Sequence, residues 1–120
     1  MSTAFVTYEN PHLDLSPADK WVDSIVLIFP EPVSQITLQP QLALARARKV
    51  LSAMTRDDYL ILLGDPVMMG MVTAVAAELL GKVKILRFDR REFKYIPVEI
   101  DFVSRTSLDE PTAMRLNPQS

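Results

Sequence analysis

The stretch from Tyr59 to Phe88 constrains the fold of this 120-residue chain most strongly, because it has the pattern of a strand, a helix and a second strand in succession. Leu60–Leu63 is continuously apolar, as is typical of a strand that is covered on both faces. Asp65 follows as a helix N-cap with Pro66 at the first helical position, and Gly81 suits the left-handed residue that ends the helix. The stretch therefore predicts a βαβ unit.

Segments on either side of this unit extend it to a small α/β domain. Ile25–Phe29 is another all-apolar run, which we interpret as a core strand, and Pro40–Met54 has the apolar spacing of an amphipathic helix. Val83–Phe88 and Phe93–Phe102 are extended patterns that are joined by the polar loop Asp89–Glu92, which predicts a hairpin. The order β-α-β-α-β-β predicts a Rossmann-like domain of two or three layers, with three parallel strands and an antiparallel edge strand.

We predict a single domain over residues 1–103, followed by a polar C-terminal tail over residues 104–120. Residues 1–24 are expected to pack on this domain as an N-terminal extension, in which Ala4–Tyr8 has the composition of a short, isolated strand. In the last strand, Ile96 and Val98 fall on one face together with Ile100 and Phe102. Pro97 places that strand at a sheet edge or at a bulge, because proline has no N–H for a ladder.

Composition excludes several classes of function. The chain has no cysteine, which excludes disulfides, thiolate catalysis and thiolate zinc sites. Its N-terminus lacks the charged and apolar regions of a signal peptide, and the apolar run Val67–Ala77 is about half the length of a membrane span. We therefore expect a soluble, cytoplasmic protein that does not enter a membrane.

A first candidate site lies at the carboxyl edge of the predicted sheet, where open parallel sheets bind ligands. Three loops meet there and bring together the charged residues Glu31, Asp65, Asp89, Arg90 and Arg91. Capping, turn formation and solvation explain each of these residues individually, and we favour that structural interpretation. Pro66 and Asp65 make the turn unsuitable for phosphate, and neither glycine-rich nucleotide-binding motif occurs. We expect no cofactor, no resident metal and no catalytic residue.

A second candidate site is the helix that begins at Pro66, which is unusually apolar for so small a chain. Either the monomer covers both of its sides or a protein partner covers one, and the latter predicts a homodimer or a complex with another protein. Small residues and adaptable methionines form the candidate interface, which consists of Met68, Met69, Gly70, Met71, Thr73 and Ala77.

A third possibility is nucleic-acid binding through the hairpin. Its basic cluster comprises Lys82, Lys84, Arg87, Arg90, Arg91 and Lys94, with aromatic residues nearby. Strand alternation places Lys84 and Arg87 on opposite faces, so the charges do not form one stripe. This layout favours a protein partner over nucleic acid.

The segments DYLILLGDPVMMGMVTAVAAELL and GKVKILRFDRREFKYIPVEIDF, over about residues 57–102, resemble small proteins of tailed bacteriophages. The shared features are a Gly-Asp-Pro helix start and a hairpin that ends in a Tyr-x-Pro-Val-Glu-like strand. The resemblance implies a phage accessory protein that acts by binding something in an infected bacterial cell. We therefore expect a non-enzymatic protein-binding domain that uses the apolar helix and the charged hairpin. The alternatives are a ligand-binding or hydrolytic domain that uses the edge carboxylates, and nucleic-acid binding.

Overall fold

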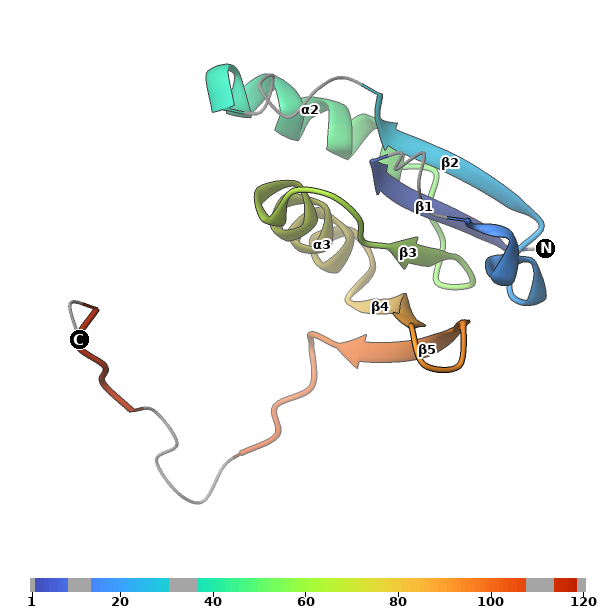
Figure 1. Ribbon diagram of the computed structural model, residues 1–120. Helices are drawn as coiled ribbons and strands as arrows, with labels where there is room; N and C mark the ends of the chain where they lie inside the picture. The colour runs from blue at the N-terminus through green and yellow to red at the C-terminus, as the bar shows by residue number, and fades with distance from the viewer. Residues whose placement is uncertain (1, 9–13, 31–36, 108–113, 119–120) are drawn as a thin grey trace.

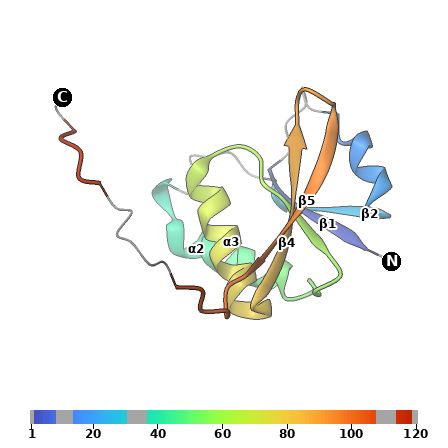
Figure 2. The same cartoon turned by 90° about the horizontal axis from the view of Figure 1, so that it is seen from below.

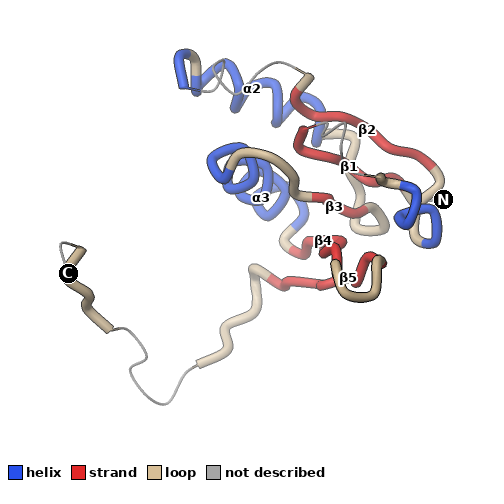
Figure 3. Tube along the Cα trace, viewed as in Figure 1, coloured by secondary structure: helices blue, strands red, loops and turns tan. Residues whose placement is uncertain are grey.

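The computed structural model describes residues 2–8, 14–30, 37–107 and 114–118, and these residues form an α/β domain around one five-stranded sheet (Figures 1 and 3). The predicted α/β class with an antiparallel edge hairpin is confirmed. In chain order the elements are β1 (Thr3–Tyr8), the 3₁₀ helix η1 (Ser16–Lys20), β2 (Ser24–Phe29), α2 (Pro40–Leu51), β3 (Tyr59–Ile61), α3 (Pro66–Leu80), β4 (Lys82–Asp89) and β5 (Lys94–Asp101).

The strand order is β2-β1-β3-β4-β5, and β1 lies inside the sheet rather than packing on it as part of an extension. It is parallel to both of its neighbours, and Phe5 pairs with Val26 of β2 and Leu60 of β3. The sheet therefore has four parallel strands instead of the predicted three, followed by antiparallel β5. Residues 4–7 are all buried, as expected for a strand that has neighbours on both sides and is covered on both faces.

Helices α2 and α3 lie side by side on one face of the sheet, and η1 lies on the other (Figure 2). On the helix side, Phe5, Leu60 and Val83 of the sheet pack against Leu51 of α2 and Val72 of α3 in one buried cluster. On the opposite side, a second cluster joins the sheet to η1 and the residues after it, and consists of Ala4, Val6, Ala18, Val22, Ile61, Leu86 and Tyr95. The domain thus has a helical layer, a sheet and a thin third layer.

The predicted start and end of α3 are confirmed. The Asp65 carboxylate accepts hydrogen bonds from the N–H groups of Val67 and Met68, at 2.9 and 3.2 Å. Gly81 ends the helix with a φ of 75°, a conformation that favours glycine. The helix therefore has satisfied donors at its N-terminus and an unstrained turn into β4.

Two element ends differ from the expectation. β3 ends at Ile61 instead of Leu63, because the Thr7 hydroxyl of β1 bonds to the backbone of Leu63 in place of a strand partner: it accepts from the N–H at 2.6 Å and donates to the carbonyl. Helix α2 ends at Leu51 instead of Met54. Met54 is nevertheless buried in the core. Its apolar side chain therefore indicated a buried position and not a helical one.

The outer strand β5 is paired on one side only. Pro97 lies opposite Leu86 in an uninterrupted antiparallel register, so β5 is an edge strand without a bulge at this point. Two helices of about 10 Å width cover about four strands that are about 4.8 Å apart. Helices α2 and α3 therefore leave the fifth strand outside their cover, which determines where the candidate site lies.

Candidate functional site

The helix-side face of β5 carries a row of exposed apolar side chains. Ile96, Val98 and Ile100 lie opposite Arg87, Ile85 and Val83 of β4, while Tyr95 points to the other face and is buried. The row continues at Phe102, and we call these four residues, Ile96, Val98, Ile100 and Phe102, the β5 strip. Their exposed fractions are 37–41%, although Val83, which lies opposite Ile100 on β4, is buried.

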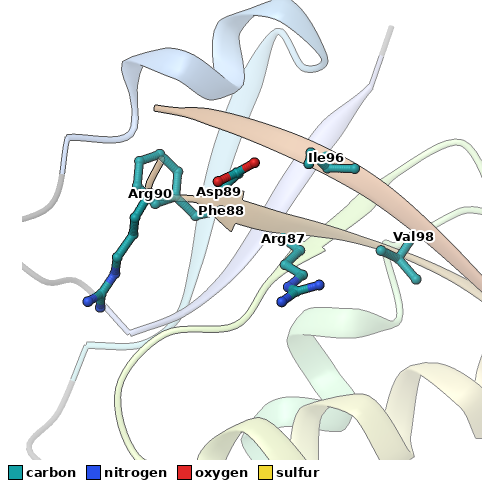
Figure 4. A pocket seen from close by; sticks show the side chains of 6 residues that line it. All are labelled: Arg87, Phe88, Asp89, Arg90, Ile96 and Val98. Atoms are coloured by element: carbon teal, nitrogen blue, oxygen red, sulfur yellow. The ribbon is translucent and has the colours of Figure 1, made fainter. Parts of the chain in front are cut away.

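A groove of about 400 Å³ adjoins the hairpin end of this strip (Figure 4). Arg87 and Val98 extend from neighbouring strands toward the side on which α3 lies, whereas the Asp89 carboxylate points away from both guanidinium groups of the groove. Its lining consists of Arg87, Phe88, Asp89, Arg90, Ile96 and Val98. The groove therefore combines two cationic side chains with an apolar floor.

The hairpin turn itself is held by local interactions. The Asp89 carboxylate accepts a hydrogen bond from the N–H of Arg91 at 2.9 Å, and Phe93 adopts a positive φ of 51°. The Phe93 ring packs edge-on against Phe88, with ring centroids 5.4 Å apart. Lys94 forms an ion pair with Glu92, and this contact raises the pKa of Lys94. These contacts fix the position from which Arg90 projects.

Among the sequence-predicted ligand residues, the structure brings Asp89 and Arg90 together in the groove. Arg91 is exposed in the turn and does not line the groove, and Glu31 lies outside the described residues. Asp65 is occupied as the N-cap of α3, and no hydrogen bond or ion pair within the described part of the chain joins it to the hairpin. The structural interpretation of Asp65 as a cap is therefore confirmed, whereas a cluster of edge carboxylates is not formed by the described residues.

The candidate interface on α3 is partly internal. Met68 is fully buried in the core, and Met71 and Ala77 pack against the same cluster, so Met68 presents no surface to a partner. Met69 and Thr73 are half-buried, and the Thr73 hydroxyl donates to the Met69 carbonyl at 2.8 Å. Gly70 is exposed but offers no side chain. The sheet and the neighbouring α2 thus cover two sides of α3, which explains much of its apolar character.

Basic side chains are divided between the two faces of the hairpin. Lys84 lies over the ring of Tyr59 at 4.6 Å on the η1 side, where Lys20 lies over the ring of Trp21 at 5.6 Å. Arg87 is on the helix side, in register with Ile96. No continuous basic stripe results, as strand alternation indicated.

From the sequence, Arg87 was assigned only to the basic cluster considered for nucleic acid, and Ile96 and Val98 were not assigned to a site. The alternating apolar pattern of β5 could have identified Ile96 and Val98. An edge strand with one apolar face needs a helix or a partner over that face, and a hairpin connection adds no helix. Within the described ranges, no group of three metal-ligating side chains occurs. The helices described there include none that is long and apolar enough to cross a membrane.

A comparison with protein families gives a match over most of the chain. A family model described as "Phage Pam3 gp32-like protein" matches residues 3–102, from the start of β1 to just beyond β5. No curated protein and no solved structure matches the chain. The match confirms the resemblance to phage proteins and extends it over all five strands. The chain therefore belongs to the family of Phage Pam3 gp32-like proteins.

Proposed function

We propose that this phage protein is a non-enzymatic accessory protein that binds another protein in the cytoplasm of the bacterial host. The binding surface is the side of the domain formed by the hairpin β4–β5 and the exposed part of α3. The partner is a bacterial protein or a second copy of the chain. Asp65 and Asp89 have structural roles, as the N-cap of α3 and in the hairpin turn, and we therefore assign them no catalytic part.

The β5 strip is the observation that carries this proposal. Four large apolar side chains in a row remain 37–41% exposed at the β5 edge of the sheet. Removing apolar surface from water contributes about 25 cal/mol per Å², so an occupant of this strip gains binding free energy without any change in the fold. Contiguous apolar patches with a polar rim are typical of protein interaction sites.

Pro97 determines how a partner approaches. The register with β4 is regular, so the ring nitrogen of Pro97 occupies a position that points away from β4 toward the open edge. A strand added at this edge would therefore lack one ladder hydrogen bond at its centre. We accordingly place the contact on the face of β5 rather than along its edge.

A comparison of three forms of the protein tests the proposal: the wild type, Val98→Asp in the strip and Leu42→Asp on the exposed side of α2. Each is used to capture proteins from a bacterial lysate, and its mass in solution is measured by sedimentation velocity. We expect a captured protein, or a dimer, that is present with the wild type and Leu42→Asp and absent with Val98→Asp. Equal capture by all three forms together with a monomeric wild type would refute the proposal.

A further inference from the structure

The groove at the hairpin end of the β5 strip identifies the chemistry of the partner. We propose that it binds a segment of another protein in which carboxylate side chains adjoin large apolar ones. This inference rests on the proposed function and assigns the partner class and the residues that recognise it. The cationic residues are Arg87 and Arg90, and the apolar residues begin with Ile96 and Val98.

The two arginines are available for a ligand. Both are exposed, and within the described residues neither side chain makes a hydrogen bond or an ion pair. The nearest acidic residue in the groove, Asp89, directs its carboxylate away from them and accepts from the N–H of Arg91. Guanidinium groups bind carboxylates in a bidentate geometry, and such charge-assisted bonds are stronger than neutral ones. Carboxylates are therefore the expected complement of this end of the groove.

The length of the strip indicates a polypeptide rather than a small molecule. From Ile96 to Phe102 the strip spans six residue steps, or about 20 Å at about 3.3 Å per residue. The groove encloses only the first part of this length, and Ile100 and Phe102 lie beyond it. A partner that covers the whole strip must extend past the groove, as an extended segment of about six residues or a helix of about 13 does.

Charge argues against a second copy as the occupant. In a twofold contact the same surface appears on both subunits, so a contact whose axis passes through the groove would bring Arg87 and Arg90 close to the same arginines of the other copy. Such like-charge contacts are unfavourable. Nucleic acid is also disfavoured, since it needs a continuous basic surface and Lys84 lies on the opposite face of the hairpin.

Selection from a random 12-residue peptide display library against the immobilised full-length protein tests the inference. Enriched peptides are synthesised with a fluorophore, and their dissociation constants are measured by fluorescence anisotropy. We expect sequences that pair Asp or Glu with Leu, Ile, Phe or Trp. Arg87→Glu and Arg90→Glu should each weaken their binding at least tenfold, and Val98→Asp should do the same.

Arg91→Glu is the matched control, because it makes the same charge change next to Arg90 without altering a groove residue. It should change the dissociation constant less than threefold, and circular dichroism melts should show all variants folded. The inference is overturned if no peptide is enriched, if the enriched peptides lack acidic residues, or if Arg87→Glu has no more effect than Arg91→Glu. If the enriched peptides are non-acidic and Val98→Asp abolishes their binding, this inference is overturned and the proposed function is retained.

Three further arms test other occupants of the groove, and the first two use competitors of the selected peptides. A synthetic peptide of residues 104–120, which contains Asp109 and Glu110 between apolar residues, tests the chain's own end. A 30-nucleotide single-stranded DNA tests nucleic acid, and sedimentation velocity of the wild-type protein tests a second copy. We expect neither competitor to displace the peptides when its concentration is ten times their dissociation constant, and we expect the wild type to sediment as a monomer. Displacement by either competitor, or a wild-type dimer that Val98→Asp dissociates, assigns the groove to that occupant and overturns the inference.

Discussion

Replacement of Tyr95 by phenylalanine is expected to stabilise this protein. The Tyr95 side chain is only 2% exposed, and it lies in the cluster between the sheet and η1. Its ring packs against Phe88 with centroids 5.0 Å apart, and its carbonyl accepts from the indole N–H of Trp21 at 3.2 Å. Its hydroxyl, however, is buried without a hydrogen-bond partner among the described residues. Tyr95→Phe keeps the ring and the carbonyl and removes only the unsatisfied group.

The magnitude follows from the cost of burying that hydroxyl. Protein mutational data put an unpaired buried hydroxyl at about 1–3 kcal/mol, and the lower end applies where the surroundings relax. We therefore expect Tyr95→Phe to raise the free energy of unfolding by about 1 kcal/mol. For a domain of roughly 100 residues this corresponds to about 4–8 °C in the melting temperature.

The stability difference should also depend on pH. Burial, with a smaller contribution from the negative charge of Asp14, raises the pKa of Tyr95 above its ordinary value of 10.0. Above about pH 10 the unfolded chain releases this proton while the folded chain retains it, so the unfolded state binds fewer protons and stability falls as pH rises. Tyr95→Phe removes this loss, and its advantage over the wild type should grow between pH 9 and pH 11.

Urea unfolding followed by circular dichroism at pH 7 and at several alkaline pH values measures both effects. Tyr59→Phe is the control, because Tyr59 is half-buried and its ring contributes through contacts with Lys84 and Trp21 that phenylalanine retains. It should change stability by less than about 0.5 kcal/mol. A destabilised Tyr95→Phe, or an advantage over the wild type that does not change with pH, would show that the hydroxyl is satisfied and that the reasoning is wrong.

Three further substitutions test other parts of the structure by urea unfolding or sedimentation. Asp58→Ala should lower the free energy of unfolding by about 2–3 kcal/mol, because the buried Asp58 carboxylate accepts hydrogen bonds from the N–H groups of Thr3 and Thr55 and its removal leaves both unpaired. A decrease of less than about 1 kcal/mol would contradict this. Asp65→Ala should lower the free energy of unfolding by about 1 kcal/mol because it removes the N-cap of α3, whereas Asp65→Asn should retain most of the stability. Equal decreases for the two variants would argue against capping. Pro97→Val should restore an N–H at the open edge of β5 and promote concentration-dependent association, and an unchanged sedimentation coefficient would refute the assigned direction of that edge.

The sequence predicted best those elements whose signals are local. The βαβ unit around α3 was recognised because its cap, its first-turn proline and its terminal glycine all belong to one short segment. The place of β1 was not recognised, because nothing within Ala4–Tyr8 indicates which strands pair with it. Its neighbours begin about 20 and 55 residues further along the chain, and such pairings depend on the whole sheet.

The candidate site was predicted in part, for a related reason. Asp89 and Arg90 were identified because both lie in the turn of a recognisable hairpin, and the structure places them in the groove. Arg87, Ile96 and Val98 were not assigned to it, since their significance depends on which strand α3 covers. The apolar character of α3 suggested a partner on the helix, whereas contacts with α2 and the sheet account for much of that character.

The topology explains why the helix-side face of β5 keeps its apolar side chains exposed. The parallel strands β3 and β4 are reached through α2 and α3, and these helices then cover the helix-side face of the sheet. β5 is reached instead through a tight hairpin, which adds a strand without adding a helix. A solvent-facing strand surface needs no large apolar residues, and polar ones at positions 96, 98 and 100 would fit the same register. The chain has Ile96, Val98 and Ile100 there, beside two arginines without a described partner, and this combination is the physical basis for placing the binding surface on this face rather than on α3 alone.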